Sequence, residues 1–323
     1  MELNLKKENF LSEILVNIIG IIISIIALWK GADFLIENSY KVAKKHNISE
    51  SIIGLTILAF GTSLPELLVS LSAALMGSSN ISIGNVIGSN IFNLGFILGL
   101  TALIHPIKIK KDILYRDIPF FIISSLVFIF LALDKILSRL DGLILLTLFG
   151  IFIFVLLKTN SSFQEEEEII EIDKNPKVSF FTYLAIGLSL GALIFFSKLL
   201  VTLSKDLALK LGISDWIIGS TIVALGTSFP EFVTSLVAVL KKRYSMSIGN
   251  ILGSNIFNIC LVLGSASLIF PMNVKKEAIL GSFLLVLLGI YLFFVGYKYK
   301  ALSRFNAFIL LILGIFSYFK ILK

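Results

Sequence analysis

Long apolar segments separated by short polar ones occupy almost the whole chain. We predict ten membrane-spanning helices, at residues 11–31, 50–76, 82–104, 117–133, 140–157, 179–203, 215–240, 247–269, 277–296 and 303–320. Most have about 20 residues, the length that an α-helix needs to cross a hydrocarbon core of about 30 Å. The apolar residues are continuous rather than alternating, so the pattern does not predict a β-barrel. The polar, acidic segment 158–177 divides the ten spans into two sets of five.

The composition agrees with this pattern. Of the 323 residues, 57% are hydrophobic and 15% are charged, whereas a soluble protein has about 25% charged residues. We therefore predict an all-α polytopic membrane protein. The net charge of +7 does not indicate nucleic acid as a partner, because Lys and Arg form short clusters between apolar runs, where topology signals lie. One Cys and two His leave too few ligands for a Cys- or His-based metal site, and we expect no cofactor.

An internal repeat relates the two halves. Residues 48–93 align without gaps to residues 213–258, at a constant offset of 165, and 27 of the 46 positions are identical. An odd number of spans in each half means that the second copy enters the membrane from the opposite side, as in many secondary transporters. We predict a first inverted repeat at 1–157, a linker at 158–177 and a second repeat at 178–323.

The distribution of Lys and Arg predicts the orientation. The side of the membrane that holds the linker would carry 17 of the 28 basic residues, and the other side 11. The richer side is expected to be cytoplasmic. We therefore predict a multi-pass protein of the cell membrane, with the linker cytosolic and both termini extracellular.

Two glutamates stand apart from the other acidic residues. Glu66 and Glu231 are the only ones deep within the predicted spans, where a carboxylate costs about 2.5–3.5 kcal/mol and is a functional residue by default. A protonated or paired structural carboxylate is the alternative. Near the span ends, a capping or solvated role is expected for Glu50, Asp117, Asp134 and Asp215.

Each glutamate follows a predicted helix break. The sequence Gly-Thr-Ser-x-Pro occupies residues 61–65 and 226–230; proline removes a helical hydrogen bond, and glycine lets the backbone leave helical geometry. Irregular backbone at membrane depth survives only inside protein or around a cavity. Four carbonyls are predicted to lack helical partners: those of Ala59, Thr62, Ala224 and Thr227. With a carboxylate, they would form an oxygen cage for a cation.

The following span in each half carries a polar stripe. Its members recur every three or four residues, on one face of a helix: Ser82, Asn85, Ser89 and Asn93 in the first half, and Ser247, Asn250, Ser254 and Asn258 in the second. Gly84 with Gly88, and Gly249 with Gly253, form GxxxG pairs that allow helices to approach closely. All these ligand types are oxygen, as calcium requires. Hydrogen bonding between helices is the alternative role for the stripe.

The two motifs, GTSLPE…GNVIGSNIFN and GTSFPE…GNILGSNIFN, resemble the α-repeats of the sodium/calcium exchanger branch of the calcium/cation antiporter superfamily, in its two-repeat prokaryotic form. The resemblance implies a ten-helix inverted-repeat fold, with Glu66 and Glu231 as charged ligands. The further ligands that it implies are Ala59, Thr62, Ser63, Ala224, Thr227, Ser228, Ser89, Asn93, Ser254 and Asn258. It also implies that spans 11–31 and 179–203 move against the remaining core.

Two departures from relatives bear on the coupling ion. Some relatives, including potassium-dependent ones, have Asp at a position matching Asn93 or Asn258; both are Asn here, which puts potassium transport in doubt and leaves a fixed charge of −2. The cation/proton branch usually reads GNATE around its acid, where this chain has GTSLPE.

We therefore predict an antiporter that exchanges sodium for calcium by alternating access, with no enzymatic activity. The expected partners are calcium and sodium ions and the lipid bilayer, and a monomer is expected. The alternatives are a cation/proton antiporter, a potassium-dependent variant, a cation channel and an intramembrane hydrolase with paired carboxylates.

Overall fold

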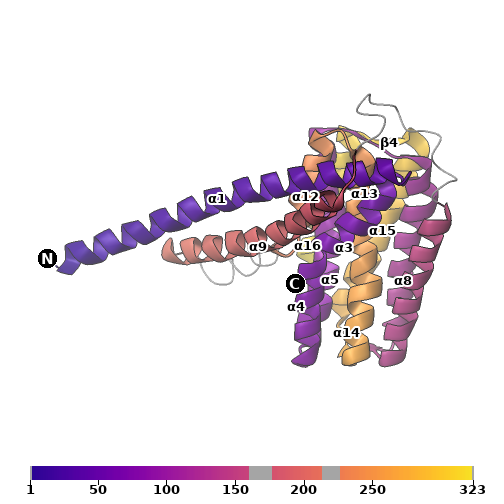
Figure 1. Ribbon diagram of the computed structural model, residues 1–323. Helices are drawn as coiled ribbons and strands as arrows, with labels where there is room; N and C mark the ends of the chain where they lie inside the picture. The colour runs from indigo at the N-terminus through magenta and orange to yellow at the C-terminus, as the bar shows by residue number, and fades with distance from the viewer. Residues whose placement is uncertain (1, 160–176, 213–225, 322–323) are drawn as a thin grey trace.

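The computed structural model describes residues 2–159, 177–212 and 226–321, which form a helical bundle with two long helices set across it (Figure 1). The first half contains α1 Glu2–Lys45, α2 Glu50–Ile53, η1 Gly54–Leu58, α3 Ala59–Thr62, α4 Leu64–Leu75, α5 Ser79–Ile91, η2 Phe92–Ile97, α6 Leu98–Ile104, β1 Ile107–Lys108, η3 Ile113–Asp117, α7 Ile118–Leu131, β2 Ile136–Leu137 and α8 Arg139–Thr159. The second contains α9 Phe180–Lys210, α12 Phe229–Leu240, α13 Tyr244–Phe257, η6 Asn258–Leu263, α14 Gly264–Ile269, β3 Met272–Asn273, α15 Lys276–Tyr299, β4 Ala301–Leu302 and α16 Arg304–Ile321.

Eight helical segments within the described residues are long and apolar enough to cross a membrane. A ninth span is present if the bent pair Glu50–Thr62 and Leu64–Leu75 is taken as one. The prediction of a span at 215–240 falls partly outside the described residues, which include only α12 from that region. The chain is thus a mostly helical membrane protein with eight or nine described candidate spans.

Helix α1 is longer than predicted. It is a continuous helix of 44 residues, about 66 Å at 1.5 Å per residue, whereas the sequence pattern placed its end near residue 31. The polar residues that follow, Asp33, Glu37 and Lys41, recur every four positions and share one face. An ion pair of 2.8 Å joins Lys41 to Glu37, so the helix continues until the backbone turns at Asn47, where φ is 52°.

Helices α1 and α9 run side by side and project beyond the bundle (Figure 1). Near their projecting ends, Asn17 donates a hydrogen bond of 2.7 Å to Asp206, and Lys210 forms an ion pair of 2.9 Å with Glu13. At the bundle, Lys241 in the turn after α12 lies 2.8 Å from Asp33 of α1. These polar contacts join the two long helices to each other and α1 to the bundle.

Features of the backbone recur at the offset of 165 that relates the two sequence motifs. All six residues with positive φ form pairs at this offset within the described residues: Asn47 with Gly212, Gly77 with Lys242, and Lys135 with Lys300. The short strands do the same, since β3 is the counterpart of β1, and β4 that of β2. Strand β1 pairs antiparallel with β4, and β2 with β3, so each ladder joins one half of the chain to the other.

Helix α13 lies at the centre of the bundle. Its residues from Ser245 to Phe257 are all buried, and it packs against the segments α2, η1 and α3. A Cβ atom at Gly253 would lie 2.7 Å from Cβ of Ala59, and one at Gly249 would lie 2.7 Å from the carbonyl oxygen of Ser51. The predicted close approach is therefore confirmed for this glycine pair. The same prediction for Gly84 and Gly88 is not confirmed within the described residues, where a Cβ atom at either position would have no neighbouring atom within 4 Å.

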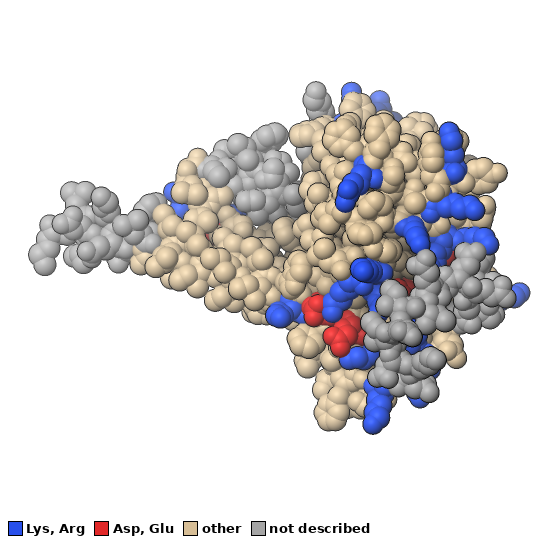
Figure 2. Space-filling model, turned by 90° about the horizontal axis from the view of Figure 1, so that it is seen from above, with Lys and Arg blue, Asp and Glu red and all other residues tan. Residues whose placement is uncertain are grey.

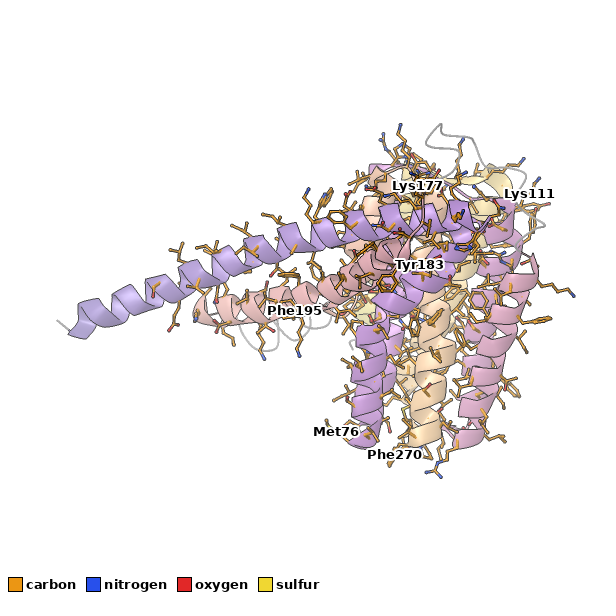
Figure 3. The ribbon with its side chains drawn as sticks, viewed as in Figure 1. Met76, Lys111, Lys177, Tyr183, Phe195 and Phe270 are labelled. Carbon is orange, nitrogen blue, oxygen red and sulfur yellow. The ribbon has the colours of Figure 1, made fainter. Side chains whose placement is uncertain are left out.

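Apolar side chains cover the sides of the bundle, as lipid contact requires. Leu68, Phe154 and Phe294, for example, are more than half exposed. Many Lys and Arg side chains lie at the end of the molecule that is seen from above in Figure 2. Lys111 and Lys177 mark this basic end, and Met76 and Phe270 lie at the opposite end (Figure 3).

A buried ionic cluster corrects one expectation. A capping or solvated role was predicted for Asp117, but its side chain is fully buried and receives hydrogen bonds of 2.6 and 3.1 Å from Arg116. Arg116 also donates to Thr159 and lies 3.8 Å from Asp112, which accepts a hydrogen bond from Ser51. The basic residue adjacent in sequence makes burial of the carboxylate tolerable, because a buried charge needs a partner.

Candidate ion-binding site

The predicted break in the first copy is present. The helix bends by 47° between Thr62 and Leu64, and Ser63 at the bend has φ −84° and ψ 4°. Pro65 lies in the first turn of α4, where its missing N–H costs no helical hydrogen bond. In the second copy, Ser228 has φ −88° and ψ 7° just before α12. The Gly-Thr-Ser-x-Pro motif therefore starts a new helix in each half.

One expectation about the freed carbonyls is wrong. The carbonyl oxygen of Ala59 accepts a hydrogen bond of 3.0 Å from the backbone N–H of Ser63, as in a regular helix, because Ser63 at the bend still closes the last turn of α3. It also lies 3.4 Å from the hydroxyl of Thr62. A carbonyl has two lone pairs, so these contacts limit the role of Ala59 as a ligand. Its counterpart Ala224 lies outside the described residues.

Glu66 and Glu231 occupy the first turns of α4 and α12, and both are fully buried. The N-terminus of a helix favours negative charge. Ser63 donates a hydrogen bond of 3.1 Å to Oε1 of Glu231, and Ser228 donates one of 3.3 Å to Oε1 of Glu66. Each serine thus contacts the glutamate of the other half. These crossed bonds bring the two breaks together.

The helices of the polar stripe close the sides of this site. Thr62 donates to Oδ1 of Asn250 at 3.3 Å and lies 3.5 Å from the hydroxyl of Ser254. Ser254 in turn lies 3.5 Å from Oε1 of Glu231. The counterpart contacts, at an offset of 165, join Thr227 to Asn85 and Ser89, each at 3.5 Å.

The remaining members of the stripe fasten helices together. The amide nitrogen of Asn85 donates to the carbonyl of Glu66 at 3.3 Å and to Ser70 at 3.0 Å. Asn250 makes the same two contacts, with Glu231 and Ser235. The backbone oxygen of Ser82 accepts from Ser70 at 3.3 Å, and the Ser247 hydroxyl donates to the Ser235 carbonyl at 3.0 Å. The alternative structural role thus applies to the hydroxyl of Ser247, whereas the hydroxyl of Ser82 has no partner within the described residues. The side-chain oxygens of Asn85 and Asn250 point to the threonines.

Seven buried side-chain oxygens have no hydrogen-bond partner within the described residues. Three are the hydroxyls of Ser39, Ser82 and Thr234. The other four belong to the two glutamates and to the last asparagine of each polar stripe: Oε2 of Glu66, Oε2 of Glu231, Oδ1 of Asn93 and Oδ1 of Asn258. Asn93 and Asn258 lie in the π-helical segments η2 and η6, which contact the opposite glutamate helices, α12 and α4. Buried oxygens without donors are costly, and a cation would satisfy them. Two of the four glutamate and asparagine oxygens come from each half of the chain.

Two further residues were missed by sequence reasoning. Asn90 and Asn255 are fully buried. Oδ1 of Asn90 accepts a hydrogen bond of 3.0 Å from Nδ2 of Asn258, and Oδ1 of Asn255 accepts one of 3.1 Å from Nδ2 of Asn93. The available signal was their identity in the repeated GSNIFN motif, but they fall outside the spacing of the polar stripe. The π-helical segments were also missed, although such turns are frequent at functional sites.

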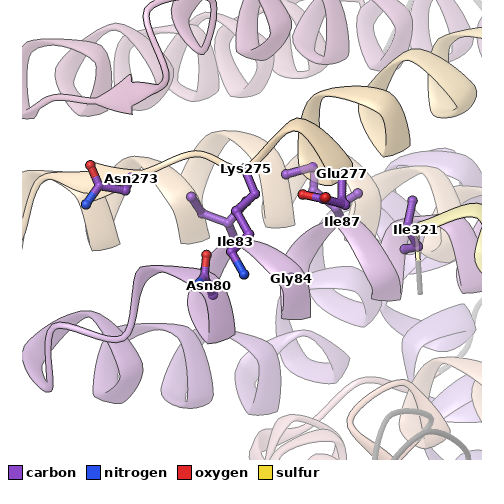
Figure 4. Close-up of a pocket in the computed structure, with 9 residues that line it drawn as sticks. Asn80, Ile83, Gly84, Ile87, Asn273, Lys275, Glu277 and Ile321 are labelled. Atoms are coloured by element: carbon purple, nitrogen blue, oxygen red, sulfur yellow. The ribbon is translucent and has the colours of Figure 1, made fainter. Parts of the chain in front are cut away.

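A separate cavity of about 330 Å³ lies away from this site (Figure 4). It is formed by the start of α5, the segment from β3 to the start of α15, and Ile321 at the end of α16; its polar residues include Lys275 and Glu277. Among the described residues, no group of three or more His, Cys, Asp or Glu side chains is arranged to hold a metal ion. The candidate site thus has two carboxylates and otherwise neutral oxygens.

A helical membrane bundle with repeat-related polar oxygens around two buried carboxylates is typical of a secondary ion transporter. The family model described as sodium/calcium exchanger protein matches residues 16–158 and 181–322. The chain belongs to this family, which confirms the resemblance of the two motifs.

Individual proteins agree with this assignment. The chain is 38% identical over 291 residues to an uncharacterized membrane protein of Methanocaldococcus jannaschii, covering 89% of this chain and 92% of the relative. It is 32% identical over 306 residues to the sodium/calcium exchanger MaX1 of Methanosarcina acetivorans, covering 82% and 87%. A structure of the sodium-calcium exchanger NCX_Mj, soaked with 10 mM Na⁺ and no Ca²⁺, matches with a TM-score of 0.81 and 34% identity, covering 94% of this chain and 98% of that one.

Proposed function

We propose that this chain is an antiporter that exchanges sodium for calcium by alternating access, and that Glu66 and Glu231 bind the transported ions. The observation that carries the proposal is the set of four unpartnered oxygens, two from each half, at the crossed serine–glutamate bonds. Family membership supports the same exchange.

The charge of the site explains how the ions compete. Two carboxylates balance one Ca²⁺, which takes 6–8 oxygen ligands at about 2.3–2.6 Å. The same oxygens can instead surround several Na⁺ ions, so one occupant excludes the other. The ligands that complete the site are Thr62, Thr227, Ser63, Ser228, Ser89, Ser254, Asn93 and Asn258. The carbonyl of Ala59 adds only the lone pair that its helical hydrogen bond leaves free, and Ala224 is its counterpart in the second half. Asn93 and Asn258 are neutral, which favours exchange without potassium.

The chain is divided into two inverted repeats of five spans, at 1–157 and 178–323, joined by the linker 158–177. The recurrence of positive φ at an offset of 165 supports this division, as do the strand ladders between the halves. The basic end lies in the cytoplasm, because Lys and Arg are retained there. The linker is then cytosolic, both termini are extracellular, and the protein acts in the cell membrane as a monomer.

Helices α1 and α9 move together against the bundle. The contacts that support a joint movement are those at their projecting ends, Asn17 with Asp206 and Lys210 with Glu13. The ion pair between Lys241 and Asp33 is a contact of α1 with the bundle at the basic end. It breaks when the access pathway changes sides.

Uptake of radiolabelled calcium into proteoliposomes loaded with sodium tests the exchange. Glu66→Gln and Glu231→Gln should each abolish uptake, since each removes half of the fixed charge. Glu277→Gln is the matched control, because this exposed glutamate lies in α15, and it should transport normally.

The outcome of this assay also separates the alternatives. Uptake that depends on a proton gradient alone would identify a cation/proton antiporter, and a requirement for potassium would identify the potassium-dependent variant. Flux that ignores every counter-ion gradient would indicate a channel. Normal uptake by either Gln variant would remove that glutamate from the site.

A further inference from the structure

Asn90 and Asn255 form a symmetric pair at the centre of the bundle. Each lies one residue after a serine of the polar stripe, and each is fully buried. The amide nitrogen of Asn90 donates to the carbonyl of Asn255 at 3.0 Å. The amide nitrogen of Asn255 donates to the carbonyl of Asn90 at 3.3 Å. The pair therefore joins α5 to α13 across the two halves.

These backbone bonds determine which way each amide faces. A backbone carbonyl only accepts hydrogen bonds, so the group directed at it must be the NH₂ of the asparagine. The side-chain oxygens of Asn90 and Asn255 are then left as acceptors. Oδ1 of Asn90 receives Nδ2 of Asn258 at 3.0 Å, and Oδ1 of Asn255 receives Nδ2 of Asn93 at 3.1 Å.

The orientation of the second pair follows from the first. With Nδ2 of Asn258 engaged by Asn90, its Oδ1 is the atom without a partner in the described structure, and the same holds for Asn93. If either amide rotated by 180°, it would present an NH₂ group in place of an oxygen. That group carries partial positive charge and has no lone pair for a metal ion.

We propose that Asn90 and Asn255 are positioning residues that keep the amides of Asn258 and Asn93 with oxygen, rather than NH₂, toward the transported cation. The inference rests on the proposed function, because it takes Asn93 and Asn258 as ligands. It assigns each positioning residue to one ligand of the opposite half: Asn90 to Asn258, and Asn255 to Asn93.

Each positioning residue acts on one ligand of the opposite half, so its effect on calcium binding should depend on which ligand is substituted. A general structural role would give the same effect in every background. An aspartate at the ligand position has an oxygen in either orientation, so it needs no positioning. Asn90→Ala should weaken calcium binding about tenfold or more in the native background and less than threefold in the Asn258→Asp background. In the Asn93→Asp background, Asn90→Ala should still weaken calcium binding about tenfold or more. Asn255→Ala should show the opposite pattern, with its loss reduced only by Asn93→Asp.

Calcium binding is measured by isothermal titration of the full-length protein in detergent, and sodium-driven uptake is measured in parallel. Losses of equal size in all backgrounds would overturn the proposal. If sodium fails to drive uptake in the native protein, the proposed exchange fails, while the binding titrations still decide the positioning role.

A second variant, Asn90→Asp, tests the proposal even if the alanine variants fold poorly. Asn90→Asp keeps an acceptor for Nδ2 of Asn258, loses the donor to the carbonyl of Asn255 and adds a negative charge. It should bind calcium at least as tightly as the native protein. Binding ten times weaker would show that Asn90 acts through the backbone bond, and would overturn the proposal.

Discussion

The substitution Gly253→Ala should separate two helices at the ion-binding site. A Cβ atom at this position would lie 2.7 Å from Cβ of Ala59, 2.8 Å from Cα of Leu55 and 2.9 Å from the carbonyl oxygen of Leu55. Non-bonded carbon atoms ordinarily lie about 3.5–4.0 Å apart. Two of the three contacts are with backbone, so rotation of a side chain cannot relieve them.

The contact distances set the size of the effect. Helix α13 must move by roughly 0.8 Å from η1 and α3 to restore ordinary contact. Overpacking of this kind lowers the free energy of unfolding by about 1–3 kcal/mol. Replacing Gly by Ala within a helix raises it by about 1 kcal/mol. We expect a net loss of about 1 kcal/mol in the free energy of unfolding.

The effect on calcium should be larger than the effect on stability. Ser254 follows Gly253 directly and already lies 3.5 Å from Glu231 and from Thr62, at the limit of hydrogen bonding. Calcium tolerates ligand distances only within about 2.3–2.6 Å. A shift of nearly 1 Å should therefore weaken calcium affinity at least tenfold.

Thermal unfolding in detergent and calcium uptake in proteoliposomes measure the two effects. Gly150→Ala is the matched control, because this glycine is exposed in α8 and a Cβ atom there would have no described atom of another segment within 4 Å. The control should gain up to about 1 kcal/mol from helix propensity and transport calcium normally. If Gly253→Ala behaves like this control, the close approach at Gly253 does not shape the site.

Two further predictions concern hydrogen bonds and charge in the bundle. Ser63→Ala and Ser228→Ala each remove one crossed bond to a carboxylate, so calcium titrations of uptake should show similar losses of affinity, about tenfold each; a loss in only one variant would contradict the equivalence of the halves. Arg116→Met should lower the free energy of unfolding by about 3–5 kcal/mol, because Asp117 stays buried without its partner. The added change Asp117→Leu should restore most of this loss in denaturant unfolding, and no recovery would refute the explanation.

Much of the protein could be predicted from the sequence. The apolar segments define the spans because each must cover a fixed thickness of hydrocarbon. The repeated Gly-Thr-Ser-x-Pro-Glu motif predicts the break at Ser63 and the buried Glu66, since proline and glycine act on the local backbone. The family follows from the same motif. These features depend on local chemistry or on a pattern of residues close together in the chain.

Only the tertiary structure decided which residues meet. Ser63 contacts the glutamate 168 residues away rather than its neighbour Glu66, and Asn90 holds the amide of Asn258. Asp117 is buried with Arg116, although its position near a span end predicted exposure. Such contacts depend on how the two halves of the chain pack against each other. The offset of 165 shows which residues correspond, but it does not give the distances between them. The sequence thus determined the ligand types, and the docking of the halves determined which oxygens remain free for an ion.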